Sequence, residues 1–439
     1  MTEQRRKQGE AGFWIRVSVM AVAVFLVAAV PQTQAQTYSV IHSFSGNADG
    51  SFPETGLTVD RNGNLYGTTT AGGRGSCSSE FGPGCGSIFK MSRSGSGWIV
   101  TPLYEFAGGT ADGASSVSRL IFGPDGRIYG ATINGGLGTC DSVFGTGCGI
   151  VFSLQPSGTI CRTPMCPWTE TVLYRFTGRS DGGEPLGDLA FDRAGNLYGA
   201  TLGGGAHAGG VVFKLTPSSA GWTESVLYNF TGDADGGHPW GGVAFDSAGN
   251  LYGTTAGGGF IDNGVCSEGC GTVWKLTPSG SGWAETTVHT FNGTDGNFSA
   301  ASFVFDQQGN LYGDATSGGT NDGGTVFELT PANGGWDLSI LQQSLSGGTQ
   351  GGSWASLTFD NAGNLLGTAK GGGVHGGGSV FRLTESGGSW SFADVHDFQY
   401  PSDGEYPLSS VAEDANGNLY GTTLLGGANN SGVVWEITP

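Results

Sequence analysis

Short runs of alternating apolar and polar residues recur along the chain and are separated by glycine-rich turns. The clearest run reads Val-Phe-Lys-Leu, with copies at 88–91, 151–154, 212–215, 273–276, 326–329, 380–383 and 434–437. Alternation with a period of two is typical of a β-strand with one buried face. Abundant glycine and β-branched residues disfavour helix throughout. The pattern therefore predicts an all-β protein.

A second phrase, Gly-Asn-Leu-Tyr-Gly-Thr-Thr with small variations, precedes each of these runs. Its second glycine recurs from Gly67 to Gly421, which is 354 residues over six steps and a mean period of 59 residues. Each repeat offers four strand candidates: an apolar run before the phrase, the phrase itself, the Val-Phe-Lys-Leu run, and a run that starts near a tryptophan. A fixed period of short apolar runs indicates a repeat architecture. Seven units of four strands predict a seven-bladed β-propeller.

The strand count also predicts how the ring closes. The seventh repeat ends after its third strand, at Pro439, whereas residues 38–44 match a fourth strand. We expect 38–44 to pair with 433–437, because this pairing removes the open edge of the array. The tryptophans that start the fourth strands are expected to pack between blades, with ligand stacking as the minority alternative. They are Trp98, Trp168, Trp222, Trp283, Trp336 and Trp390.

The N-terminal segment and the charge bear on location. Residues 1–35 combine a basic start, an apolar run over 17–30 and a small residue, Ala35, which together predict a cleaved signal peptide. Residues 36–439 are then one propeller domain. The net charge of −19 disfavours nucleic acid and anionic lipid surfaces as partners. We expect a secreted, extracellular or cell-surface protein, or a periplasmic one, without membrane insertion after cleavage.

The eight cysteines all follow residue 35 and form four local pairs. Disulfides are the default in exported proteins. Zinc is disfavoured, because its four ligands would have to converge from separate loops that lack histidine at the usual spacing. The predicted disulfides join Cys77 to Cys85, Cys140 to Cys148, Cys161 to Cys166, and Cys266 to Cys270.

One full copy of the repeat is spelled by 246–255, 257–259 and 271–276. This copy resembles the Gloeo/Verruco (GloVer) repeat of the choice-of-anchor GloVer-containing bacterial proteins. The resemblance covers essentially the whole chain after residue 35. It implies a secreted or surface-displayed protein, and it does not imply a biochemical role.

The loops before the first strands are expected at the mouth of the central channel, beside the glycine-rich loops after the phrase. Six of them carry an Asp-Gly pair, and this repetition favours a turn-capping role for the aspartates. The alternative is a polyhydroxylated ligand held between carboxylates and aromatic faces. The candidate ligand-binding residues are Asp181, Asp235, His238, Trp240, Trp354, Asp403 and Tyr406.

The regular repeats predict an exported binding or scaffold module for a polysaccharide or a cell-surface protein. No Gly-x-Ser-x-Gly elbow lies on a strand-to-helix turn, and no helical His-Glu-x-x-His occurs. The alternative is a glycoside hydrolase or polysaccharide lyase with its site at the channel mouth, because propellers host both. No cofactor is predicted. A weak calcium site remains an alternative at 233–236, although Ala244 stands where a calcium loop has glutamate.

Overall fold

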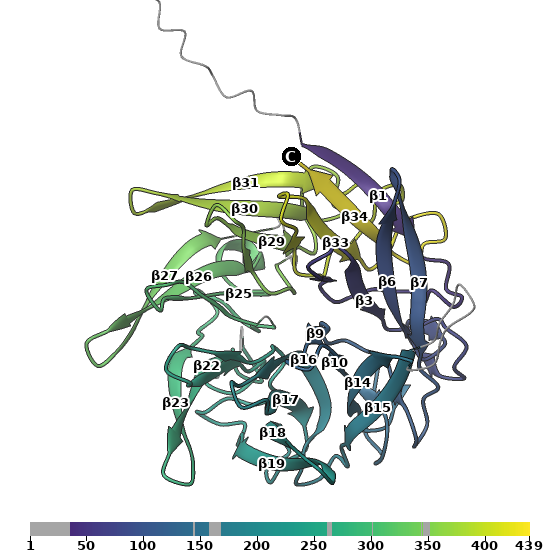
Figure 1. The fold of residues 1–439 in the computed structure, drawn as a ribbon. Helices are drawn as coiled ribbons and strands as arrows, with labels where there is room; N and C mark the ends of the chain where they lie inside the picture. The colour runs from purple at the N-terminus through teal and green to yellow at the C-terminus, as the bar shows by residue number, and fades with distance from the viewer. Residues whose placement is uncertain are drawn as a thin grey trace, which may run out of the picture. The chain divides into compact units, whose positions relative to one another are not determined.

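Seven four-stranded antiparallel sheets follow one another along the chain and surround a central axis (Figure 1). The computed structural model describes residues 36–143, 145–157, 168–260, 266–300, 302–343, 345 and 352–439. The predicted signal peptide and the Cys161–Cys166 pair lie outside the described residues. The seven-bladed β-propeller predicted from the repeats is confirmed.

The blades are numbered 1 to 7, and each runs from an inner strand to an outer one. The inner strand has two residues in every blade except blade 3, where it has nine. In order from the axis outward, the strands are β2 (Thr58–Val59), β3 (Leu65–Thr69), β6 (Ser87–Ser94) and β7 (Gly97–Glu105) in blade 1; β9 (Ile121–Phe122), β10 (Ile128–Thr132), β14 (Ile150–Pro156) and β15 (Trp168–Arg175) in blade 2; β16 (Gly183–Phe191), β17 (Leu197–Gly203), β18 (Val211–Ser218) and β19 (Gly221–Asn229) in blade 3; β20 (Ala244–Phe245), β21 (Leu251–Thr254), β22 (Thr272–Ser279) and β23 (Gly282–Thr290) in blade 4; β24 (Val304–Phe305), β25 (Leu311–Ala315), β26 (Thr325–Ala332) and β27 (Gly335–Gln343) in blade 5; β28 (Thr358–Phe359), β29 (Leu365–Ala369), β30 (Ser379–Ser386) and β31 (Ser389–Asp397) in blade 6; and β32 (Ala412–Glu413), β33 (Leu419–Thr423), β34 (Val433–Thr438) and β1 (Thr37–Ser43) in blade 7.

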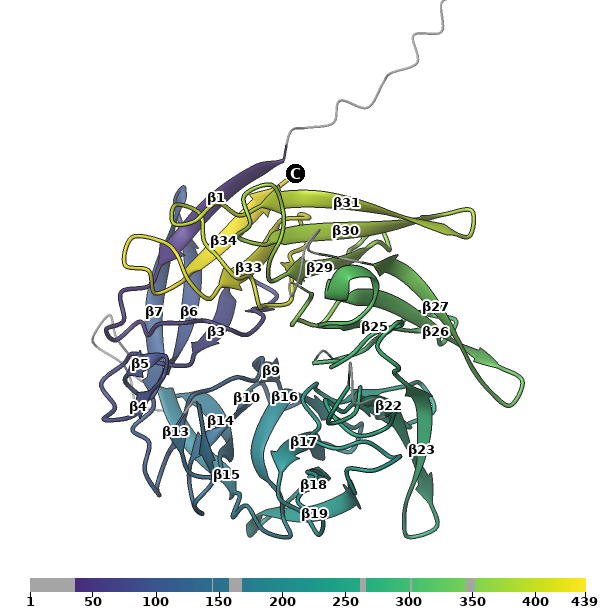
Figure 2. The same ribbon diagram turned by 180° about the vertical axis from the view of Figure 1, so that it is seen from behind.

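The first and last strands of the ring lie side by side in blade 7, as predicted (Figure 2). Tyr38 pairs with Ile437, and His42 pairs with Val434, in an antiparallel ladder. Phe44 is fully buried and its ring lies 5.1 Å from that of Phe89 in blade 1. The N-terminal strand therefore completes one blade and leads directly into the core beside the next.

The hydrophobic core is divided into seven clusters, each between two adjacent blades. The six predicted inter-blade tryptophans take part in this packing. Trp283, for example, lies edge-on to Tyr198 of the preceding blade, with 6.1 Å between ring centroids. The equivalent contacts join Trp98 to Tyr420, Trp168 to Tyr66, Trp222 to Tyr129, Trp336 to Tyr252, and Trp390 to Tyr312.

Close packing explains the second glycine of the repeated phrase. A Cβ on Gly253 would lie 2.3 Å from Cζ2 of Trp274 on the neighbouring strand, and a Cβ on Gly67 would lie 2.5 Å from Cζ of Phe89. Real Cβ atoms do not approach this closely, so the aromatic ring of the third strand requires glycine opposite it. The two halves of the repeat are therefore coupled by one steric contact.

The threonine after that glycine links neighbouring blades, and Asp314 replaces it in blade 5. Thr254 Oγ1 donates to the Ser299 carbonyl of the next blade at 3.0 Å, and Thr368 Oγ1 donates to Ser409 at the same distance. Asp314 is fully buried, and burial raises its pKa to about 8, more than the nearby Ser353 hydroxyl lowers it. Blade 5 therefore holds a carboxyl group where blades 1, 4, 6 and 7 hold a threonine hydroxyl and blades 2 and 3 hold an alanine methyl group.

Deleting residues 36–45 should strongly lower the melting temperature or cause aggregation, because it exposes the edge of β34 and the apolar side chains that β1 covers. Burial of apolar surface stabilises the folded state by roughly 25 cal/mol for each Å² removed from water. Thermal unfolding followed by circular dichroism measures the effect, with a chain that lacks only residues 1–35 as the control. An unchanged melting temperature would show that the ring does not depend on β1.

Gly253→Ala should destabilise the protein by about 1–3 kcal/mol, because the added methyl group overpacks the Trp274 ring. Gly282→Ala is the matched control, since a Cβ there meets nothing within 4 Å. Urea unfolding of both variants gives the comparison. Equal stability of the two would contradict the steric explanation.

Asp314→Thr should stabilise the protein increasingly as pH rises from about 4 to about 8. The folded pKa of Asp314 is raised, so its contribution is most favourable below the unfolded pKa and is lost as pH approaches the folded value. The upper limit is about 1.4 kcal/mol per pH unit. Free energies of unfolding across this range test it, with the exposed Asp337→Thr as control. If the difference in free energy of unfolding between Asp314→Thr and the unchanged protein did not vary with pH, ionisation of Asp314 would not destabilise the fold.

Candidate functional site

The loops before the inner strands and the loops after the second strands lie on one face of the ring, as predicted. Backbone bridges join them within four blades, at Ser51 with Ala71, Gly237 with Gly257, Asn297 with Ser317, and Glu405 with Leu425. These loops surround the mouth of the central channel. Residues that differ between repeats therefore meet there.

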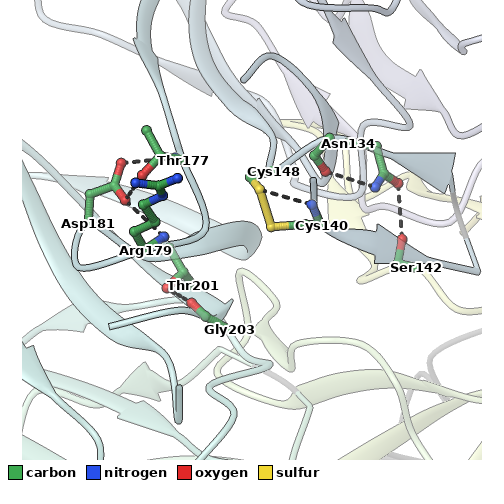
Figure 3. Close-up of a disulfide and its surroundings, with 10 residues drawn as sticks. Asn134, Cys140, Ser142, Cys148, Thr177, Arg179, Asp181, Thr201 and Gly203 are labelled. Atoms are coloured by element: carbon green, nitrogen blue, oxygen red, sulfur yellow. Dashed lines mark hydrogen bonds between the residues drawn. A yellow bond between two sulfur atoms is a disulfide. The ribbon is translucent and has the colours of Figure 1, made fainter. Parts of the chain in front are cut away.

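The predicted aspartates are engaged in turns. Asp181 accepts from the Thr177 backbone N–H at 2.9 Å and from the Tyr174 hydroxyl at 3.1 Å (Figure 3). Asp235 makes the same bonds with Thr231 and Tyr228, each at 2.9 Å. Asp403 accepts from the Gln399 backbone N–H at 2.6 Å and lies 3.1 Å from His396 Nε2. These contacts favour the turn-capping interpretation over the ligand-binding one.

Three residues after each of these aspartates, the chain adopts a left-handed backbone conformation that non-glycine residues rarely occupy. The six non-glycine examples have φ between 56° and 59°: Phe52, Ser115, Glu184, His238, Phe298 and Tyr406. Each such conformation costs of order 1–3 kcal/mol and requires compensation from its surroundings. His238 shows the compensation, since its N–H donates to Gly209 of the preceding blade at 2.8 Å and its carbonyl accepts from Ala256 at 3.0 Å.

Three disulfides hold the loops that receive these bonds. Cys77–Cys85, Cys140–Cys148 and Cys266–Cys270 are formed as predicted. Figure 3 shows the second of them. The second cysteine of each pair accepts the inter-blade bond: Cys85 from Ser115 at 2.9 Å, Cys148 from Glu184 at 2.8 Å, and Cys270 from Phe298 at 3.1 Å. The disulfides therefore fix the acceptors that position the channel mouth.

Each blade contributes two residues to the wall of a cavity of about 340 Å³ in the channel, which we call the channel cavity. In blades 1–5 and 7, the residue two positions after the left-handed residue belongs to the upper ring, and the residue four positions after it belongs to the lower ring. Blade 6 contributes Trp354 and Ser356 from the equivalent positions. The upper ring is Glu54, Val117, Leu186, Trp240, Ala300, Trp354 and Leu408. The lower ring is Gly56, Arg119, Asp188, Gly242, Ser302, Ser356 and Ser410.

Three aromatic side chains cluster on one side of the mouth. The Trp240 ring lies 5.2 Å from that of Phe298 and 6.2 Å from that of Trp354, and Phe298 lies 5.6 Å from Trp354. Lys370 Nζ lies 4.9 Å from the Trp354 ring and 5.6 Å from the Tyr406 ring. The cluster forms an apolar wall with one cation above it.

Two carboxyl groups in the channel cavity, Glu54 and Asp188, have different surroundings. Burial raises the pKa of Glu54 to about 8, although the positive charge of Lys370 opposes this shift. The Glu54 carboxyl therefore keeps its proton to a higher pH than an exposed glutamate does. Asp188 forms an ion pair with Arg119, whose Nη2 lies 2.9 Å from the Asp188 carboxylate.

A second cavity of about 630 Å³, the rim cavity, adjoins the first and shares Trp240, Trp354 and Lys370 with it. His238 lines the rim cavity, with Nδ1 3.1 Å from the Leu202 carbonyl oxygen. The structure thus brings together three predicted residues, His238, Trp240 and Trp354.

Tyr406 lies beside Lys370 but outside the lining of both cavities. Sequence reasoning missed Lys370 and Glu54. Both depart from the apolar or neutral residues at the equivalent positions of the other repeats, so an alignment of the seven copies would have singled them out.

The described residues contain no group of three or more His, Cys, Asp or Glu placed to hold a metal ion. The same part of the chain has no helix long and apolar enough to cross a membrane.

The similarity between this chain and a solved structure is one of fold alone. The extracellular domain of a "putative hybrid two component system" from B. thetaiotaomicron is 10% identical, with a TM-score of 0.51; the match covers 91% of this chain and 39% of that one. A "putative 6-phosphogluconolactonase" from Bacteroides uniformis is 14% identical, with a TM-score of 0.47, and the match covers 78% and 84%. This chain thus spans about two fifths of the first protein's length.

No curated protein sequence gives a significant match. The Gloeobacter/Verrucomicrobia repeat, in contrast, matches residues 137–268 and 266–439, which is more than half of the chain. The phrase, the glycine opposite the aromatic ring and the third strand fall within both matched segments. The chain therefore belongs to the Gloeobacter/Verrucomicrobia repeat family.

Proposed function

We propose that the protein is an exported binding module that holds a segment of polysaccharide at the channel mouth. The observation that carries this proposal is the aromatic cluster of Trp240, Phe298 and Trp354, which lies where the channel and rim cavities meet. The disulfides support an oxidising, extracellular location for such a module.

The cluster supplies what a sugar ring requires. Aromatic faces pack against the C–H surfaces of the ring, while a few fixed polar groups orient its hydroxyls. Lys370 and the protonated form of Glu54 can both donate hydrogen bonds to sugar hydroxyls. The backbone bonds between blades keep the wall preorganised. A preorganised wall lowers the entropy cost of binding.

A second candidate function is glycoside cleavage in the same channel. It is favoured by one observation: the channel cavity contains two carboxyl groups in different surroundings, Glu54, whose pKa is raised by burial, and Asp188, which is paired with Arg119. Two carboxyl groups with different protonation states are the usual acid and base of such enzymes.

Trp354→Ala should weaken polysaccharide binding about tenfold or more, because it removes one face of the aromatic cluster. Affinity electrophoresis against a panel of soluble polysaccharides identifies a ligand and then ranks the variants. Ile99→Ala, at an exposed apolar residue of β7, is the control for folding. A panel without any ligand, or equal affinity of both variants, would exclude the channel mouth as the site.

Binding should also weaken as pH rises above about 8, since Glu54 then ionises and can no longer donate a hydrogen bond. Glu54→Gln keeps a donor and should remove this dependence. Product analysis of the same mixtures separates the two functions: reducing ends or unsaturated sugars that disappear in Glu54→Gln would establish cleavage, and intact polymer would leave binding alone.

A further inference from the structure

We propose that the groove between blades 5 and 6 binds the guanidinium group of an arginine side chain from a partner protein. The groove is a cavity of about 830 Å³. Blade 5 contributes Tyr312 and Glu328, and blade 6 contributes Glu385 and Trp390. Turns between first and second strands also line it, so it opens on the face opposite the channel mouth.

The equivalent groove between blades 7 and 1 contains a guanidinium from the chain itself. Arg93 stacks on Trp98, with Cζ 4.6 Å from the ring centroid. Its Nη2 donates to the Tyr420 hydroxyl at 2.9 Å and forms an ion pair with Glu436. Trp98 Nε1 lies 3.4 Å from the same carboxylate. This groove therefore shows which group the frame of tyrosine, tryptophan and glutamate accepts.

The groove between blades 5 and 6 has the same frame without the arginine. Tyr312, Glu328 and Trp390 occupy the repeat positions of Tyr420, Glu436 and Trp98. The tyrosine and tryptophan centroids are 5.8 Å apart in both grooves. Tyr312 donates to Glu328 at 2.9 Å, just as Tyr420 donates to Glu436 at 3.1 Å.

Glu385 takes the place of Arg93, and each is paired across its hairpin with the groove tryptophan. The cation is thus replaced by a fourth carboxylate beside Glu328, Asp306 and Asp360, and no Lys, Arg or His belongs to the lining. Arg382 lies outside the lining, and its Nε is 3.4 Å from the Asp360 carboxylate. The groove is therefore strongly negative within an apolar frame.

Three further blades place a cation of their own over the same tyrosine. Lys90, Lys214 and Lys275 lie 5.4 to 5.6 Å from the rings of Tyr66, Tyr198 and Tyr252. Blade 5 has Glu328 at this position, so a cation from a partner would take the place that a lysine fills in blades 1, 3 and 4. A guanidinium fits better than an ammonium, because it is planar, stacks on tryptophan and pairs with carboxylates through several N–H groups.

The test uses N-acetyl-arginine amide, with N-acetyl-citrulline amide as its uncharged analogue, titrated into the protein and followed by ligand-observed NMR. The arginine compound should bind at least tenfold more tightly than the citrulline compound. Glu385→Arg should weaken arginine binding at least tenfold, because it places a guanidinium where Arg93 lies in the other groove. Glu328→Lys should also weaken arginine binding at least tenfold. The variant should fold, because blades 1, 3 and 4 have lysine at this position.

Asp337→Arg is the matched control, since it makes the same change of charge at an exposed residue of β27. Asp337→Arg should retain the affinity for N-acetyl-arginine amide within twofold. Trp354→Ala, at the channel mouth, should retain it as well. Equal losses in Glu385→Arg and Asp337→Arg would show attraction by net charge alone and overturn the proposal. The proposal would also be overturned if the arginine compound did not bind. Calcium binding that Glu385→Arg abolishes would then identify the groove as a cation site instead.

Discussion

The pair of backbone hydrogen bonds made by each left-handed residue controls how the blades meet at the channel. The residue donates to the preceding blade and accepts from its own, so it fixes both loops at once. An unfavourable φ is retained because both bonds compensate for it, and three of the acceptors, Cys85, Cys148 and Cys270, are also held by disulfides. The two rings of channel residues follow directly, since they lie two and four positions further along the same backbone.

This arrangement separates the parts of the repeat that must stay the same from those that can vary. The phrase glycine, the aromatic residue opposite it and the inter-blade tyrosine and tryptophan are set by packing between sheets. The upper channel ring, in contrast, holds Glu, Val, Leu, Trp or Ala in an identical backbone setting. Single residue differences between repeats therefore decide which side chains line the channel mouth and the inter-blade grooves, while the packing between the sheets stays the same.

The sequence predicted the architecture because its determinants are local and repeated seven times. Strand alternation, turn glycines and the missing fourth strand of the last repeat were sufficient for blade number and closure. The candidate site was predicted only in part. Trp240, Trp354 and His238 were singled out because they break the repeat and are large, and the structure brings them together.

Other contributions depend on distances that no single repeat encodes. Lys370 acts through its position over two rings from different loops, and the pKa of Glu54 depends on burial inside a closed ring. The groove between blades 5 and 6 is visible only when one interface is compared with another. Periodicity along a sequence does not show which residues of adjacent repeats face each other across such an interface.

Ring closure also has a consequence for how the chain is made. Thr37 and Thr438 are 401 positions apart in the sequence, yet they lie at the same end of the β1–β34 ladder. The strand synthesised first must therefore wait, with its edge unpaired, until the strand synthesised last has emerged. During that interval each finished blade can pack on its neighbour, but the ring stays open. Biogenesis of this fold thus depends on keeping one early strand from pairing with a foreign edge.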